Sequence, residues 1–168
     1  PGKNYLAQVG QDWEEEALRA EEHGIRTVVM RFGIVLGKGG GALEKMIPAF
    51  RMFAGGPLGN GRQWFPWIHL TDVIAAIDHL WGNPNLQGAF NFCAPEPVTN
   101  RQLAQHLGRR LHRPSFFPTP STLMRMLLGE LSEMLLGSQR ALPQALIESG
   151  FKFHYPTLEE ALQAILAP

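Results

Sequence analysis

The chain has 168 residues, of which 45% are hydrophobic and 18% are charged, so it can bury one ordinary core and is not disordered. Its 15 basic and 15 acidic residues balance, and we therefore expect no nucleic-acid partner. A single cysteine, Cys93, excludes an internal disulfide, and no apolar run is long enough to span a bilayer. These features predict a cytoplasmic protein without membrane contact.

The first part of the chain predicts a helix followed by a strand. Apolar residues recur at helical spacing over residues 4–22, with glutamates on the opposite face, and Gly24 ends the pattern. Residues 25–32 then form an apolar run rich in β-branched side chains, which predicts a strand of a parallel sheet that is buried on both faces. A helix, a glycine turn and a buried strand in this order are typical of the second half of a βαβ unit.

Short strands and helices continue to alternate through the middle of the chain. The expected elements are a helix over 42–53, a strand over 67–69, a helix over 72–82 and a strand over 89–92. Pro48 should kink or shorten the first of these helices, because proline lacks a backbone donor. Thr71 or Asp72 should cap the second helix. This alternation predicts the α/β class.

Helical patterns dominate the last third of the chain. Thr99 and Thr157 each begin a capping-box sequence, in which a side chain three residues later bonds back to the cap. The expected helices run from Thr99 to about residue 111, over 121–136, up to Gly150, and onward from Thr157. Prolines between the first two of these helices predict a division into residues 1–118 and a small, mainly helical part over 119–168.

A run rich in aromatic residues between positions 61 and 72 carries the strongest candidate site. Arg62 has the planar fork that binds phosphate or carboxylate, and Trp64 and Trp67 offer faces for a base or a sugar. His69 lies between a strand and a helix start, a common place for ligand-binding residues in α/β proteins. The alternative is that the aromatic side chains pack in the core and that His69 hydrogen-bonds the backbone. No second metal ligand has suitable spacing near His69, so no metal site is expected.

A second candidate site follows the strand over 25–32. Gly33, Ile34 and Val35 lie where the backbone of an α/β protein meets ligands, and the glycine permits close approach. Residues 37–70 carry four basic residues against one acidic residue, which favours an anionic ligand, although a solvated loop explains this charge equally well. The sequence contains no Gly-x-Gly-x-x-Gly, so the chain has no dinucleotide fingerprint of its own.

Several short segments together resemble one known family. They are Asp12-Trp13-Glu14; Arg31-Phe32-Gly33-Ile34-Val35-Leu36-Gly37 with Gly39-Gly40-Gly41-Ala42; Gly55-Gly56-Pro57 with Gly59; Gln63; Trp67-Ile68-His69 with Asp72; Asn91 with Ala94-Pro95; Leu142-Pro143; Gly150-Phe151-Lys152-Phe153; and Leu158-Glu159-Glu160-Ala161-Leu162. Over essentially its whole length the chain resembles the C-terminal part of the atypical short-chain dehydrogenase/reductase group of NAD-dependent epimerase/dehydratase proteins. It is most similar to nucleoside-diphosphate-sugar epimerases that carry a small C-terminal domain of unknown function.

This resemblance implies the C-terminal portion of a doubly wound, NAD(P)-binding Rossmann-like fold with a small helical C-terminal subdomain. By position, the residues that would face the nicotinamide of NADP or NAD are Gly33, Ile34 and Val35, and those that would line a sugar-nucleotide cleft are Arg62, Trp67 and His69. The glycine fingerprint of the family would lie before Pro1, so we expect the chain to be part of a longer protein. Alone, it should bind the dinucleotide weakly or not at all, and it should either pair with another copy or expose an apolar sheet edge.

One departure from the family leaves the catalytic residues unassigned. Related epimerases use a Tyr-x-x-x-Lys pair, and aligning Glu14 with the acidic residue after that lysine puts Leu6 and Gly10 at the two positions. Tyr5 is one residue off and has no lysine four positions later. The main hypothesis is an NAD(P)-dependent sugar-nucleotide epimerase or oxidoreductase. The alternatives are a non-catalytic NADP-binding sensor and an association module built on the apolar helix over 121–136.

Overall fold

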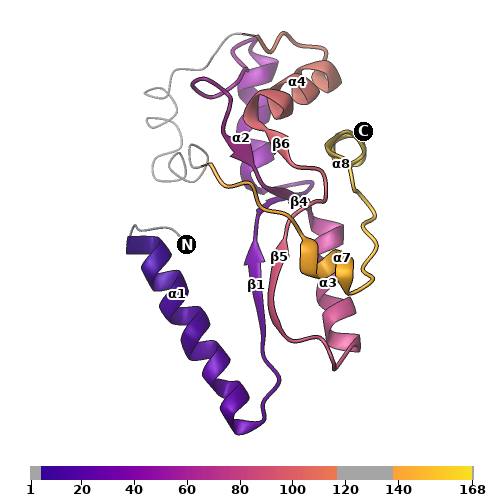
Figure 1. Ribbon diagram of the computed structural model, residues 1–168. Helices are drawn as coiled ribbons and strands as arrows, with labels where there is room; N and C mark the ends of the chain where they lie inside the picture. The colour runs from indigo at the N-terminus through magenta and orange to yellow at the C-terminus, as the bar shows by residue number, and fades with distance from the viewer. Residues whose placement is uncertain (1–4, 117–137, 168) are drawn as a thin grey trace.

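The computed structural model describes residues 5–116 and 138–167, whose arrangement is drawn in Figure 1. In chain order the elements are α1 (Tyr5–Leu18), the 3-10 helix η1 (Arg19–His23), β1 (Val28–Phe32), β2 (Ile34–Leu36), α2 (Gly41–Arg51), β3 (Trp64–Phe65), β4 (Trp67–His69), α3 (Leu70–Gly82), β5 (Gly88–Phe92), β6 (Val98–Thr99), α4 (Asn100–Leu111), α7 (Gln144–Glu148) and α8 (Leu158–Ile165). The helix expected over 121–136 lies outside the described residues. The other expected helices are confirmed.

Two pairs of parallel strands form the centre of the described structure. β1 pairs with β5, so that Phe32 lies beside Phe92, and β2 pairs with β4, so that Ile34 lies beside Trp67. β3 and β6 form a short antiparallel pair. The expected parallel α/β arrangement is therefore confirmed. The sequence patterns do not predict β2, β3 or β6, because strands of two or three residues are too short to show a period.

The β2–β4 ladder separates two hydrophobic cores, because successive side chains of a strand point to opposite faces. Ile34 and Trp67 face the first core, which is completed by α2, α4 and α8. Val35 and Ile68 face the second core, which is completed by α3, β5 and α7. Segment 138–167 therefore contributes to both cores, through α8 in one and α7 in the other. The division of the chain after residue 118 stays a prediction.

The expectation that the first strand is buried on both faces is wrong for the described residues. Met30 is 38% exposed and Phe32 is 52% exposed. Among the residues the structure describes, β5 is the one strand that hydrogen-bonds β1, so the other edge of β1 is open. α1 lies beside β1 in Figure 1 and is tied to it by an ion pair between Glu14 and Arg31 at 2.5 Å, while Trp13 of α1 is 74% exposed. The apolar edge that the sequence predicts is thus present.

Two helix boundaries differ from the expected ones. α2 runs through Pro48 and ends at Arg51, two residues before the predicted end. α3 begins directly after His69, whose Nδ1 accepts a hydrogen bond from the backbone N–H of Thr71 at 3.0 Å. The expected cap by Thr71 or Asp72 is therefore wrong, because the side chain of Asp72 is used for a different contact.

The carboxylate of Asp72 is fully buried and holds the C-terminal segment against α3. Its Oδ1 accepts from the backbone N–H of His154 at 2.7 Å, and its Oδ2 accepts from that of Tyr155 at 3.0 Å. The Nδ1 of His154 lies 3.2 Å from the same Oδ1. A buried carboxylate is tolerated when such donors replace its water. These bonds join positions more than 80 residues apart, and they fix the path of the chain between α7 and α8.

Replacing this carboxylate should weaken the fold. Asp72→Ala is expected to lower the free energy of unfolding by about 3 kcal/mol, because two backbone N–H groups lose an ionised acceptor. Urea unfolding followed by circular dichroism measures the change. The control is Asp78→Ala, an exposed position on the same helix, which should change the value by less than about 0.5 kcal/mol. Equal stability of the two variants would contradict the assignment.

Candidate functional site

Gly33 is the point where the chain passes from the β1–β5 pair to the β2–β4 pair. Its N–H donates to the carbonyl oxygen of Phe92 at 2.9 Å, and the N–H of Ile34 donates to that of Pro66 at 2.7 Å. A Cβ atom at position 33 would lie 2.8 Å from the Pro66 oxygen, which is closer than real Cβ atoms approach. At Gly33 the protein's own backbone makes a close approach, and the approach of a ligand expected there stays a prediction. A role of Gly33, Ile34 and Val35 in facing a cofactor stays a prediction.

His69 fills the corner between β4 and α3. Its side chain is 8% exposed, and its ring centre lies 4.0 Å from that of Tyr155. Burial lowers the pKa of His69 below its usual value and His154 lowers it further, while Asp72 opposes the shift. Because Nδ1 accepts the hydrogen bond that caps α3, this nitrogen carries no proton. The alternative interpretation of His69, a bond to the backbone at this corner, is confirmed, and its contact with a substrate stays a prediction.

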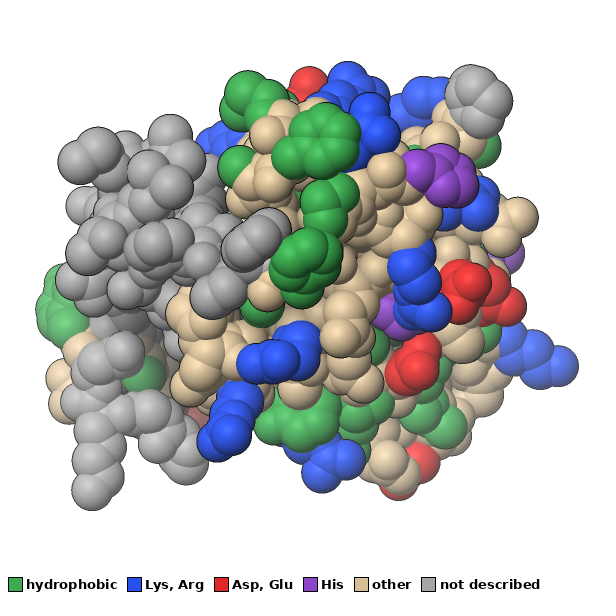
Figure 2. Space-filling model, turned by 90° about the horizontal axis from the view of Figure 1, so that it is seen from above, with side chains coloured by type: hydrophobic (Ala, Val, Ile, Leu, Met, Phe, Trp, Pro, Cys, Tyr) green, Lys and Arg blue, Asp and Glu red, His purple; other side chains and the backbone are tan. Residues whose placement is uncertain are grey.

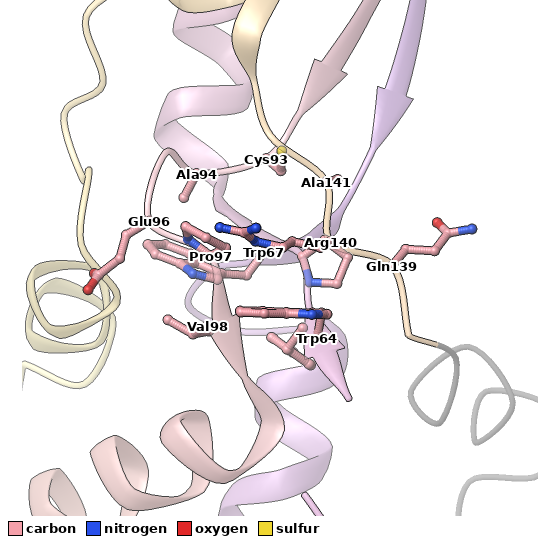
Figure 3. Close-up of a pocket in the computed structure, with 12 residues that line it drawn as sticks. Trp64, Trp67, Cys93, Ala94, Glu96, Pro97, Val98, Gln139, Arg140 and Ala141 are labelled. Carbon is pink, nitrogen blue, oxygen red and sulfur yellow. The ribbon is translucent and has the colours of Figure 1, made fainter. Parts of the chain in front are cut away.

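Trp64 and Trp67 line one small pocket, which is drawn in Figure 3. Its walls come from β3 and β4, from the turn between β5 and β6, and from the segment over 139–141. The cavity measures about 10 Å³, which is close to the space that one water molecule needs. The structure therefore brings two of the predicted substrate residues together in one small pocket.

The segment over 138–142 lies across this pocket. The guanidinium of Arg140 lies 5.1 Å from the centre of the Trp64 ring, and Figure 3 shows it above that ring. The backbone N–H of Trp64 donates to Oγ of Ser138 at 3.2 Å, and Nδ2 of Asn91 donates to the carbonyl oxygen of Leu142 at 3.1 Å. A cation–π contact at an exposed site is worth about 0.5–1 kcal/mol. The contacts that close the pocket are therefore weak.

Trp67 lines this pocket and carries a buried indole N–H. Trp67 is 1% exposed, and its Nε1 has no hydrogen-bond acceptor within residues 5–116 and 138–167. Buried indole N–H groups usually have an acceptor, because leaving one unpaired costs about 1–3 kcal/mol. Trp67 lines the pocket, and its unpaired N–H can donate to a carbonyl or hydroxyl oxygen of a ligand once the side chains that cover it move.

Arg62 lies outside the pocket. It is exposed, and its backbone N–H donates to Oδ1 of Asn60 at 2.9 Å. Of the predicted substrate residues, the structure thus brings Trp64 and Trp67 together and places His69 at the start of α3. Substrate contact by all four residues stays a prediction. Sequence reasoning missed Arg140, because it belongs to no motif and the contact of its segment with Trp64 spans more than 70 positions.

A wider hollow lies between α4 and α8. It measures about 200 Å³ and is lined by His106, Arg109, Arg110, Glu159 and Leu162. Burial and the nearby Arg109 lower the pKa of His106, and Glu159 opposes them. Figure 2 views the end of the molecule that carries α2 and α4, where a row of hydrophobic side chains has lysine and arginine side chains near both of its ends. Both signs of charge meet in the hollow, so it is not a uniform anion site.

The remaining candidate groups are excluded as reactive centres. Cys93 is 2% exposed, and burial raises the pKa of its thiol to about 11, so the thiol is neutral and unreactive. The described part of the chain holds no group of three or more side chains that could bind a metal ion.

Over the same residues, no helix is both long enough and apolar enough to cross a membrane.

Comparison with known proteins identifies the family. A model of the NAD dependent epimerase/dehydratase family matches residues 5–93, which is more than half of the chain. The chain belongs to this family. A second model, a domain of unknown function (DUF1731), matches residues 119–165. Arg140, which closes the Trp64 pocket of this epimerase-family chain, therefore lies in the part that matches the uncharacterised domain.

Named relatives extend well beyond this chain. It is 47% identical over 165 residues to epimerase family protein SDR39U1 homolog, chloroplastic, of Arabidopsis thaliana, a match that covers 98% of this chain and 47% of the relative. It is 41% identical to epimerase family protein YfhF of Bacillus subtilis, covering 98% of this chain and 54% of the relative. The chain thus spans about half the length of these relatives.

Solved structures confirm the expected fold. The human epimerase family protein SDR39U1, solved with NADPH, matches with a TM-score of 0.78 and 39% identity, over 83% of this chain and 48% of that one. A nucleoside-diphosphate sugar epimerase from Corynebacterium glutamicum matches with a TM-score of 0.77 and 28% identity, over 98% of this chain and 31% of that one. The Rossmann-like epimerase fold expected from the resemblance is therefore present.

The close approach at Gly33 makes a direct prediction. Gly33→Ala should lower the free energy of unfolding by about 2 kcal/mol, because the added Cβ would press on the Pro66 oxygen. Thermal and urea unfolding measure the effect. The control is Gly10→Ala on α1, where an added Cβ meets nothing within 4 Å and the helix should gain about 0.5–1 kcal/mol. An unchanged stability of Gly33→Ala would show that the two strand pairs can separate at low cost.

The lowered pKa of His69 makes a prediction about acid. The pKa of His69 is lower in the folded state than in the unfolded state. Its contribution to the free energy of unfolding is therefore fully present above about pH 6.5 and is lost as the pH falls through the folded pKa. His69→Asn keeps an acceptor for the cap and removes the titration. Unfolding free energies at about pH 7.5 and about pH 5.5 should therefore differ less for this variant than for the wild type. The other histidines are common to both proteins, so an identical pH dependence would contradict the assignment.

Proposed function

We propose that this chain forms the substrate-binding side of an NAD(P)-dependent epimerase, or of a related oxidoreductase, that acts on a sugar nucleotide. The observation that carries the proposal is that the parallel strands β1 and β5 end together at Phe32 and Phe92, so that Gly33–Val35 follow one strand and pocket residues 93–94 follow the other. In doubly wound sheets, ligands bind beyond the carboxyl ends of the parallel strands. Two parallel strands that end together therefore support a shared site for cofactor and substrate.

The segment Gly33–Val35 fits the flat nicotinamide ring of NADP or NAD better than it fits the phosphates. The N–H groups of Gly33 and Ile34 already donate to carbonyl oxygens, so neither is free to bind a phosphate. The segment can instead offer a ligand van der Waals contact. Dinucleotide phosphates need free N–H groups at a glycine-rich helix start, and the sequence lacks that fingerprint. The nicotinamide, when bound, exchanges a hydride with the substrate. We therefore expect a polypeptide as long as the relatives to bind the dinucleotide. This chain alone should bind it weakly or not at all.

Three side chains around the pocket supply the contacts that a sugar nucleotide requires. The guanidinium of Arg140 suits a phosphate, the ring face of Trp64 suits a base or a sugar, and the N–H of Trp67 suits an oxygen acceptor. Because the cavity is only about 10 Å³, the substrate has to displace Arg140 from the Trp64 ring. This exchanges a contact of about 0.5–1 kcal/mol for a charged hydrogen bond of about 1.5–3 kcal/mol.

The absent Tyr-x-x-x-Lys pair favours a second candidate function. Positions 6 and 10 carry Leu and Gly, neither of which can transfer a proton. An NADP-binding sensor would need no such pair, because it binds the cofactor, changes shape and converts no substrate. Chromatography of the sugar nucleotides after incubation separates the two functions. An epimerase yields a new isomer, whereas a sensor binds NADPH tightly and leaves every sugar nucleotide unchanged.

We also propose a reducing compartment such as the cytosol for the protein. Its one cysteine is buried with a raised pKa and gives no route to a stabilising internal disulfide. Oxidising compartments favour proteins that gain stability from such bridges.

The proposed function is tested with a completed polypeptide. The part of Bacillus subtilis YfhF that this chain does not match is fused to residues 1–168 to give a chimera of the relative's length. NADPH titration followed by fluorescence should show tight binding by the chimera and little or none by the 168-residue chain. Failure of the folded chimera to bind NADPH would overturn both the epimerase and the sensor proposals.

The substrate contact of Arg140 is tested with the same chimera. Arg140→Ala should weaken the binding of a UDP-sugar on the order of tenfold, because a charged contact to phosphate is lost. Isothermal titration calorimetry in the presence of NADPH measures this affinity. The control is Arg19→Ala, an exposed arginine paired with Glu16 on the N-terminal helices, which should leave the affinity unchanged. Equal affinities for the two variants would remove Arg140 from the site.

A further inference from the structure

Helix α3 carries an exposed row of large apolar side chains. Leu70, Ile74, Ile77 and Trp81 are 44%, 55%, 37% and 82% exposed, respectively. At about 100° per residue, their spacing of four, three and four places them within an arc of about 60°. We call this row of four residues the α3 stripe.

The α3 stripe is separate from the face that α3 buries. Val73, Ala76 and Leu80 pack into the second core, and the centre of that face lies roughly 100° around the helix from the stripe. A helix that is apolar on two sides is typical of one with neighbours on two sides. Because the stripe lies to the side of the buried face and not opposite to it, its neighbour should lie beside α3 in the same layer.

Other apolar surface around the second core is open as well. Leu70 lies against Gly37 at the end of β2, where an added Cβ would be 3.3 Å from the leucine side chain. Phe32 of β1 contacts the core residue Phe92, with ring centres 5.1 Å apart, and is 52% exposed. Within the described residues, β1 also has an open edge. The second core is thus bordered by an open strand edge and by an uncovered helix side.

The length of the relatives indicates what covers this surface. The chain covers 54% of Bacillus subtilis YfhF and 48% of the human SDR39U1 structure, so these polypeptides hold a further part of comparable size. In doubly wound folds, helices lie side by side on each face of the sheet. A further part of the sheet that pairs with the open edge of β1 would add helices to the layers that cover its faces, and α3 belongs to one of these layers.

We propose that the α3 stripe is the contact surface for a helix of the dinucleotide-binding half of an epimerase-family polypeptide. A second copy of this chain fits less well. Two stripes facing each other would contribute four residues each, whereas a stable interface takes about 20–30 residues from each side. The proposal concerns packing, and it holds whether or not the completed protein converts a sugar nucleotide.

Thiol accessibility tests the proposal without any ligand. Ile74→Cys is introduced into the 168-residue chain and into the chimera. All cysteines of the YfhF part of the chimera are replaced. The native Cys93 is 2% exposed and stays unreactive. Reaction with an aromatic disulfide reagent should be at least roughly tenfold slower in the chimera, because a packed thiol reacts only after local opening.

Asp78→Cys is the matched control. Position 78 is exposed on the same helix and lies outside the α3 stripe, so its thiol should react at similar rates in both proteins. Equal rates for Ile74→Cys in the two proteins would overturn the proposal. Protection of Ile74→Cys in the 168-residue chain alone, growing with protein concentration, would show that a second copy covers the stripe and would overturn it as well.

A second measurement covers the case in which the chimera does not fold, as judged by circular dichroism. The same two cysteines are placed at the aligned positions of whole YfhF. There the thiol in the stripe should be protected and the control thiol should be reactive. A freely reactive stripe thiol in that natural full-length chain would also overturn the proposal. Neither outcome depends on NADPH, so failure here is distinguishable from failure of the proposed function.

Discussion

The buried carboxylate of Asp72 is the interaction on which the rest of the described structure depends. An ionised group removed from water has to be compensated by donors, and Asp72 takes the backbone N–H groups of His154 and Tyr155. These bonds draw the chain between α7 and α8 across the start of α3. They set the Tyr155 ring against His69, and α8 packs into the first core beside α4. One carboxylate thus positions a C-terminal segment whose described residues form no strand.

The second constraint is the ladder between β2 and β4, which divides the two cores and carries the candidate site. Gly33 allows this ladder to meet the β1–β5 pair, since any side chain there would strike the Pro66 oxygen. Trp67 lines the pocket with its indole N–H buried, and Arg140 lies over Trp64 from the segment that matches the domain of unknown function. That segment therefore completes the wall of the pocket that we propose for the substrate.

The open edge of β1 and the α3 stripe have a common explanation in the length of the relatives. The sequence of β1 is apolar apart from Arg31, which suits a central parallel strand, but burial requires neighbours on both sides. Among the described residues β1 has one. The prediction of a doubly buried strand was thus right about the residue types and wrong about their exposure. Exposure depends on what packs against a strand, and the pattern of the strand itself cannot report that.

The sequence by itself determined the described helices, the strands β1, β4 and β5, and the family. Thr99 and Thr157 form the capping boxes that they predict, because the bonds join residues three positions apart and their spacing is written in the chain. The tertiary structure alone decided the cap at His69, the burial of Asp72 and the place of Arg140. Each depends on segments that are distant in sequence and meet only when both cores are packed, so no local spacing carries the information.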